Sequence, residues 1–102
     1  MLETFTAATF APHHGEPFTV RANEQITLTL TLSEVTPLGP APAPTADGPR
    51  RVPFSLLFHG PPTPILPQRI YPVDHGAIGA FELFLVPLGP DRVGMRYEAV
   101  FG

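Results

Sequence analysis

The side chains of this chain with the most obvious capacity for chemistry are four histidines, His13, His14, His59 and His75. Zinc sites use three or four ligands, commonly at short spacings along the chain. His13 and His14 are adjacent, so their side chains diverge and do not easily face one site. His59 and His75 flank a strand–loop–strand unit and are the candidate metal ligands. We nevertheless expect neither a metal nor a cofactor, because histidines at loop ends commonly hydrogen-bond to backbone groups.

Nucleophiles and paired carboxylates give no recognisable active site. Ser33 and Ser55 both lie inside strand patterns and outside any Gly-x-Ser-x-Gly elbow, and the chain has no cysteine. Glu82 and Glu98 are expected to face each other across a hairpin beside Arg96, which favours a cross-strand charge cluster over acid–base catalysis. We therefore expect that the protein is not an enzyme.

The strongest structural pattern is the closing segment, residues 79–101. Residues 81–86 and 95–101 each alternate with period two, which predicts two antiparallel strands. Pro87, Gly89 and Pro90 are expected to end the first strand, which leaves a loop of about eight residues. Phe84 and Val86 make the second face of that strand apolar as well. A strand that is apolar on both faces is expected to be covered by a second layer, a barrel interior or another copy of the chain.

Further strands are predicted at residues 18–21, 25–35, 52–59 and 69–74 by the same alternation. Within the last of these, Pro72 predicts an edge strand or a bulge. Thr6 is placed to cap one helical turn over Ala7 to Phe10. We predict one all-β domain over residues 1–102, an antiparallel barrel or sandwich of about six strands in meander order. A proline-rich loop is predicted at residues 37–51.

Composition narrows the range of functions. The net charge is −3, the six cations are all arginine, and they form no basic stripe, which argues against nucleic acid. Neither a membrane span nor a signal peptide is recognisable, and the cellular compartment stays open between the cytoplasm and an assembled extracellular structure. Charged residues make up only 15% of the chain, against about 25% in ordinary domains. So few charges predict apolar surface patches of the kind that contact partners.

The second half of the chain carries motifs that resemble those of an uncharacterised bacterial family, a domain of unknown function. They are FSLLFHGP at 54–61, LPQRIYPVDHG at 66–76, FLVPLGPD at 84–91 and YEAVF at 97–101. The resemblance is close over residues 53–101 and looser over residues 10–35. It implies no activity and no catalytic residues, and the family is loosely associated with phage-tail-collar-like proteins.

These observations predict a non-catalytic structural or protein-interaction module, self-assembling or part of a tail-like or surface fibre. The partner is expected to be a protein, either another copy of the chain in a homo-oligomer or a tail- or fibre-like protein. The residues expected to make the contact are Phe84, Val86, Gln68 and Asp91. The alternative is a small-ligand or metal-binding β-barrel that uses His59 and His75, with Tyr71 beside them.

Overall fold

The computed structural model describes residues 5–39 and 52–101. They form a short helix, a 3-10 turn and six strands. The bounds are α1 Ala7–Phe10, η2 Ala11–His13, β1 Pro17–Arg21, β2 Thr27–Pro37, β3 Phe54–Gly60, β4 Arg69–His75, β5 Gly79–Pro90 and β6 Met95–Phe101. The predicted proline-rich loop falls outside the described residues from position 40 to position 51.

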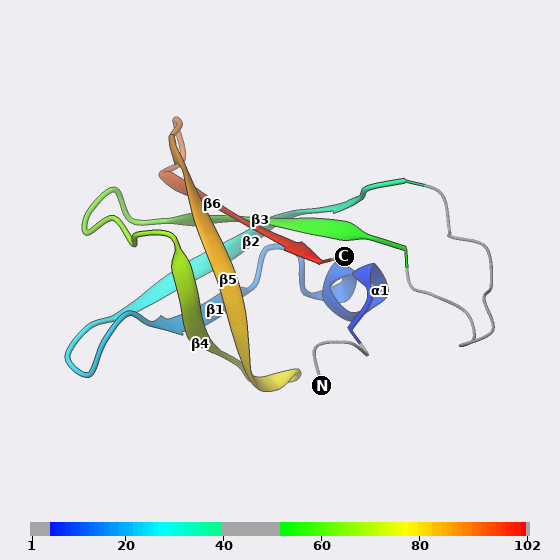
Figure 1. Ribbon diagram of the computed structural model, residues 1–102, viewed down its shortest axis with the longest axis horizontal. Helices are drawn as coiled ribbons and strands as arrows, with labels where there is room; N and C mark the ends of the chain where they lie inside the picture. The colour runs from blue at the N-terminus through cyan, green and yellow to red at the C-terminus, as the bar shows by residue number, and fades with distance from the viewer. Residues whose placement is uncertain (1–4, 40–51, 102) are drawn as a thin grey trace.

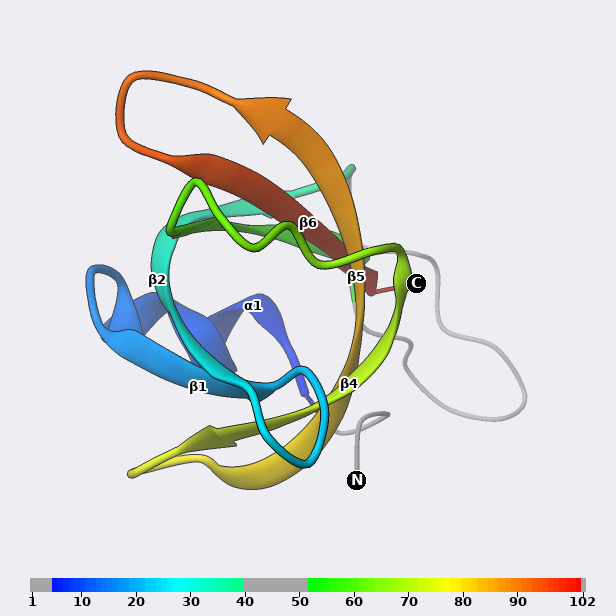
Figure 2. The same cartoon turned by 90° about the vertical axis from the view of Figure 1, so that its left-hand side faces the viewer.

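The strands close into an antiparallel barrel with the order β1-β2-β3-β6-β5-β4 (Figure 2). This confirms the all-β barrel and corrects the expected meander, because β3 pairs with β6 and β4 pairs with β1. The segment between β3 and β4 crosses the end of the barrel that faces the viewer in Figure 2. Its anchor is Leu66, whose side chain is buried and whose N–H donates to the Tyr97 hydroxyl over 2.9 Å.

Alternation of apolar and polar residues sets which side of each strand fills the barrel. In β2, Leu28, Leu30 and Leu32 are buried while the threonines between them are exposed. In β5, Phe81, Leu83 and Leu85 are buried in the same way. Side chains on a strand point alternately to its two faces, so a period of two produces one filled face and one outer face.

One end of the barrel is closed by α1 and η2, which lie beside the end of β6 in Figure 1. Thr6 precedes the helix as expected, and its N–H donates to Thr9 Oγ1 over 3.0 Å. Phe10 has no exposed surface. Five phenylalanine rings surround the Phe10 ring at centroid distances of 5.5 to 6.3 Å: Phe5, Phe18, Phe54, Phe81 and Phe101.

The prediction that β5 ends at Pro87 is wrong. The strand continues through a bulge at Pro87 and Gly89, and Pro90 still pairs with Met95 of β6. The prolines are tolerated because β4 begins opposite Leu85, so beyond that point β5 has β6 as its hydrogen-bonded neighbour but not β4. A proline without an N–H costs little where no second strand needs the donor.

The seam between β1 and β4 is the shortest pairing in the barrel. Only Thr19 with Asp74 and Val20 with Val73 are paired there, whereas β4 and β5 are paired over seven positions. The prediction of an edge strand or a bulge at Pro72 is wrong, because β4 pairs with β1 on one side and with β5 on the other, in regular register through Pro72. Pro72 is tolerated because it lies just beyond the two paired positions of the β1–β4 seam. Neither helix in the described part of the chain is long and apolar enough to cross a membrane.

Candidate functional sites: a histidine–glutamate cluster and two apolar surfaces

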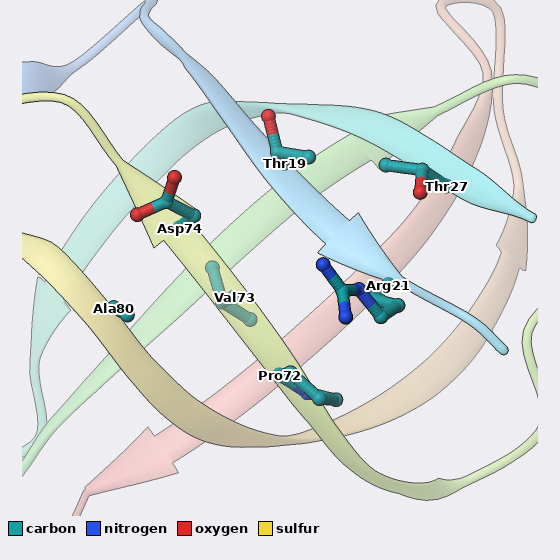
Figure 3. Close-up of a pocket in the computed structure, with 7 residues that line it drawn as sticks. All are labelled: Thr19, Arg21, Thr27, Pro72, Val73, Asp74 and Ala80. Atoms are coloured by element: carbon teal, nitrogen blue, oxygen red, sulfur yellow. The ribbon is translucent and has the colours of Figure 1, made fainter. Parts of the chain in front are cut away.

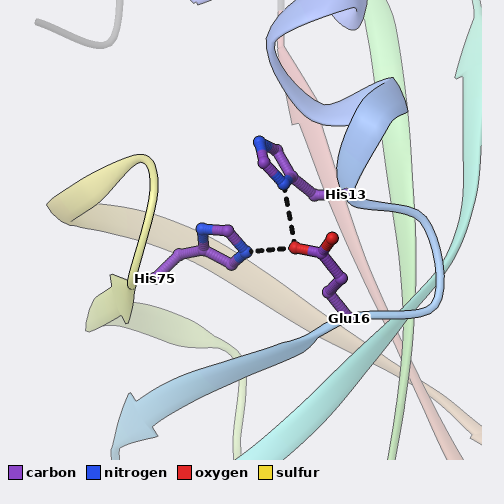
Figure 4. A group of neighbouring side chains, drawn as sticks. All are labelled: His13, Glu16 and His75. Atoms are coloured by element: carbon purple, nitrogen blue, oxygen red, sulfur yellow. Dashed lines mark hydrogen bonds and ion pairs between the residues drawn. The ribbon is translucent and has the colours of Figure 1, made fainter.

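Glu16 joins two histidines at the closed end of the barrel (Figure 4). Its Oε1 lies 2.8 Å from His13 Nδ1, at the end of η2, and 2.8 Å from His75 Nε2, at the end of β4. An ionised carboxylate only accepts hydrogen bonds, so both ring nitrogens donate. These two bonds, that from His13 first, lower the pKa of Glu16 below its ordinary value.

His75 is the most constrained member of the cluster. Its ring is buried and lies 4.5 Å from the Phe18 ring and 4.4 Å from the His13 ring, between centroids. Its Nδ1 accepts the backbone N–H groups of Ala77 and Ile78 at 3.1 and 3.2 Å. With Nδ1 as an acceptor, the neutral ring carries its hydrogen on Nε2, the atom that faces Glu16. The turn from β4 to β5 therefore selects the tautomer of His75.

A second cluster, formed by Ser33, His59 and Asp91, links β2 to the turn between β5 and β6; Ser33 lies at a bulge of β2, where the register with β3 shifts between Leu32 and Glu34. Ser33 Oγ contacts His59 Nδ1, and His59 Nε2 lies 2.8 Å from Asp91 Oδ2. The other oxygen of Asp91 accepts the N–H groups of Val93 and Gly94. The hydrogen bond from His59 is the main cause that lowers the pKa of Asp91 to about 2, with the two backbone bonds adding to it.

His14 belongs to neither cluster but lies between them. Its Nε2 donates to the Ser33 carbonyl oxygen over 2.7 Å, while His13 faces Glu16. The side chains of these neighbours diverge, as expected from their adjacency. The structure thus places His59 and His75, the two candidate metal ligands of the sequence, in separate clusters. The histidine that joins His75 is His13.

Sequence reasoning missed Glu16. The spacing His13-x-x-Glu16 was the available signal, since two ligands three residues apart reach one point when the chain turns tightly between them. Gly15, at φ +83°, and the bond from Glu16 N–H to the His13 carbonyl oxygen make that turn. His75 comes from a distant strand, so only the closure of the barrel reveals the third member.

The order Ser33–His59–Asp91 has the partners of a serine-hydrolase relay, a serine, an imidazole and a carboxylate. The geometry is the reverse of that relay. Here Ser33 faces Nδ1 of the imidazole and Asp91 faces Nε2, whereas in the relay the serine faces Nε2 and the aspartate faces Nδ1. Asp91 also completes a tight turn through its second oxygen, which gives it a structural role. The two grooves described below lie elsewhere on the barrel and are not lined by Ser33.

The first groove lies on the outside of the barrel along the short β1–β4 seam (Figure 3). It is open, with a volume of about 420 Å³. Its polar side chains are Thr19, Arg21, Thr27 and Asp74. Arg21 and Asp74 lie apart in the groove and make no ion pair within the described residues, so the groove offers one cation and one anion and does not select one ligand charge.

The outer surface of β4, β5 and β6 carries a group of large apolar side chains, here called the outer apolar face: Ile70, Phe84, Val86 and Val100. Ile70 pairs with Phe84, and their side chains are 59% and 47% exposed. Val100 is 59% exposed and Val86 is half-buried. The described chain leaves this face open to solvent, so the second apolar side of β5 is not covered from within.

Two carboxylates flank the outer apolar face. Glu82 pairs with Pro72, and Glu98 pairs with Val86 and Leu57. The expectation that Glu82 and Glu98 face each other is therefore wrong, because the strand register places Glu98 opposite Val86, further along β5 from Glu82. Neither makes an ion pair within residues 5–39 and 52–101. The Arg96 guanidinium instead donates to the carbonyl oxygens of Leu88 and Gly89.

A second apolar surface, here called the end groove, lies at the end of the barrel opposite α1. It has a volume of about 250 Å³ and runs between the β1–β2 turn and residues 64–67. Its exposed apolar side chains are Ile26 and Ile65, and Arg69 stands in its wall. Arg69 makes no ion pair within the described residues. Gln68, exposed beside Arg69, and Asp91, in its turn, lie outside the outer apolar face.

These features define a small closed antiparallel β-barrel, plugged by a phenylalanine-rich helical turn and bearing polar clusters outside its filled interior. A family model matches residues 5–101, and the chain belongs to that family, the domain of unknown function DUF6916. This confirms the resemblance to an uncharacterised domain family. Comparison with curated proteins and with solved structures gave no match.

Proposed function

We propose that the protein is a non-catalytic structural module that assembles with further copies of itself. The observation that carries this proposal is the exposure of Ile70, Phe84 and Val100 on a barrel whose interior is already filled. Large neighbouring apolar side chains on the surface of a soluble domain commonly mark a contact with a partner. Because no segment within residues 5–39 and 52–101 covers this face of β5, another molecule supplies the cover.

Charge favours a second copy in a head-to-tail arrangement as the occupant. The outer apolar face is flanked by Glu82 and Glu98, while the end groove is apolar and carries Arg69, and none of these three forms an ion pair with another described residue. The two surfaces are complementary in both hydrophobicity and charge, whereas the outer apolar face against itself would bring like charges together. The outer apolar face of one copy accordingly binds the end groove of the next.

A contact between two different surfaces of the same chain does not close on itself unless the rotation happens to form a ring. Repetition of this contact generates a fibre. An assembled tail-like or surface fibre is the setting with which the family resemblance is loosely associated, and a barrel of this kind would serve there as a repeating unit.

Light scattering behind a sizing column, over a series of protein concentrations, tests the proposal. We expect the mass to rise through successive multiples of the monomer. Phe84→Thr should weaken association about tenfold or more, as loss of an aromatic anchor does. Val93→Thr is the matched control, because Val93 is 76% exposed and lies outside both surfaces. A monomer at every concentration would overturn the proposal.

Charge reversal tests which surfaces meet. Glu82→Arg and Arg69→Glu should each weaken self-association, whereas an equal mixture of the two variants should associate, because each then presents a face that complements the other's groove. The double variant should also recover association. A closed dimer whose mass does not respond to Arg69→Glu would contradict the head-to-tail contact, since that result requires the outer apolar face to bind itself.

A further inference from the structure

We propose that His13, Glu16 and His75 form a binding site for a divalent transition-metal ion, with Zn²⁺ the ion that suits these donors best. The site is independent of the proposed assembly, because its residues lie in neither the outer apolar face nor the end groove. Two imidazoles and one carboxylate form a donor set that zinc uses in proteins, with a fourth position left for water.

The donor atoms already converge. His13 Nδ1, Glu16 Oε1 and His75 Nε2 all lie within 4.8 Å of one another. Around a tetrahedral Zn²⁺ with bonds of about 2.0–2.2 Å, neighbouring ligand atoms are roughly 3.3 Å apart. The carboxylate oxygen, now 2.8 Å from each ring nitrogen, would move outward by about half an ångström as the two rings approach each other.

The site combines a rigid member with an adjustable one. His75 is buried against Phe18 and His13, and this packing holds its Nε2 toward the cluster. The Glu16 side chain is 44% exposed, so it can shift and leave one side of the ion open to water. The donors are nitrogen and oxygen with no thiolate, which suits Zn²⁺ and its neighbours in the first transition row.

Metal binding has a specific structural consequence at His75. Coordination through Nε2 replaces the hydrogen on that atom, so a neutral ring must then carry its hydrogen on Nδ1. Nδ1 would no longer accept the N–H groups of Ala77 and Ile78, and the turn between β4 and β5 must rearrange. The hydrogen-bonded cluster is thus the metal-free state, and occupancy is reported by two backbone amides that do not touch the metal.

Titration of the chelator-treated full chain with Zn²⁺, followed by calorimetry and by amide NMR, tests the proposal. We expect one ion per chain, together with large shifts and faster hydrogen exchange at Ala77 and Ile78. Glu16→Gln keeps an oxygen acceptor for both rings but removes the charge, and it should weaken binding about tenfold or more. His13→Gln should do the same. These two variants spare the buried His75, so they test the site even if a His75 variant fails to fold.

His14→Gln and His59→Gln are the matched controls, since each removes a histidine outside the cluster while retaining a polar side chain. Both should bind Zn²⁺ as the parent chain does. The proposal is overturned if no ion binds, if Glu16→Gln and His13→Gln bind it unchanged, or if binding leaves the Ala77 and Ile78 amides unaltered. Any of these three results would mean that His13, Glu16 and His75 only hydrogen-bond to one another and do not bind a metal ion.

Discussion

His59 Nε2 lies 2.8 Å from Asp91 Oδ2, and this contact ties the turn between β5 and β6 to the C-terminal end of β3. The residues are 32 positions apart in the sequence. The remaining oxygen of Asp91 holds two backbone N–H groups of its own turn. The carboxylate therefore serves both the local turn and a long-range contact.

This contact predicts a contribution to stability that depends on pH. The pKa of Asp91 is lowered from 3.8 to about 2 in the folded chain, so its ionised form favours folding. The contribution is present above about pH 4 and is lost as the pH falls toward 2. Asp91→Asn keeps an oxygen for the turn but removes the charge. We expect the variant to be less stable than the parent at pH 6, and the difference to shrink at pH 2.5.

Urea unfolding of both chains at the two pH values, followed by circular dichroism, measures this difference. Because the Asp91 side chain is 38% exposed, added salt should reduce the effect. A difference in stability that stays constant from pH 6 to pH 2.5 would show that the ionised carboxylate gains nothing from His59.

Gly94 is expected to resist replacement because a side chain there has no room. A Cβ at this position would lie 2.3 Å from the Gly60 carbonyl oxygen, which belongs to the backbone of β3 and cannot move aside. Gly94→Ala should lower the free energy of unfolding by about 1–3 kcal/mol. Gly76→Ala is the control, since no atom of the described residues lies within 4 Å of a Cβ there. Equal stability of the two variants in chemical denaturation would refute the close approach.

The Tyr97 hydroxyl is expected to matter for the segment that crosses the barrel end. It accepts the N–H of Leu66 in a buried position, and Tyr97→Phe would leave that donor without a partner. An unsatisfied buried N–H costs about 1–3 kcal/mol, so the variant should lose about that much stability. Amide hydrogen exchange at Leu66 should also become faster. Unchanged exchange at Leu66 would mean that the bond does not hold this segment.

A non-catalytic role predicts that Ser33 does not react with serine-directed reagents. A fluorophosphonate probe followed by mass spectrometry should leave the native chain unlabelled over hours. Ser55→Ala and Ser33→Ala provide the comparison. Labelling that disappears in Ser33→Ala and persists in Ser55→Ala would instead identify Ser33 as an activated nucleophile and contradict the expectation.

Local patterns were sufficient for much of the fold. The strands and most of the core follow from period-two alternation, because whether a residue points inward depends only on its place along its own strand. The helical turn after Thr6 and the burial of Phe10 are also local matters of capping and hydrophobicity. The same alternation predicts which residues of β5 point inward and which point outward, and Phe84 is exposed because it points outward.

The predictions from sequence were wrong where the structure of a strand depends on the strands that pair with it. Pro87 and Pro90 remain in β5 because β4 is absent beside them, which the sequence of β5 cannot show. Glu82 and Glu98 do not meet, because β5 continues to Pro90 and the resulting register places Glu98 opposite Val86. The strand order departs from a meander because the segment anchored at Leu66 carries the chain across the end of the barrel.

By itself, then, the sequence determined an all-β chain with a phenylalanine core, low charge and an apolar outer side to β5. Only the tertiary structure decided which polar groups meet. Glu16 joins His13 through a tight turn, but it reaches His75 because barrel closure brings the start of β1 against the end of β4. The sequence states which chemical groups the side chains carry. The distance between two side chains 59 positions apart depends instead on how every strand between them packs.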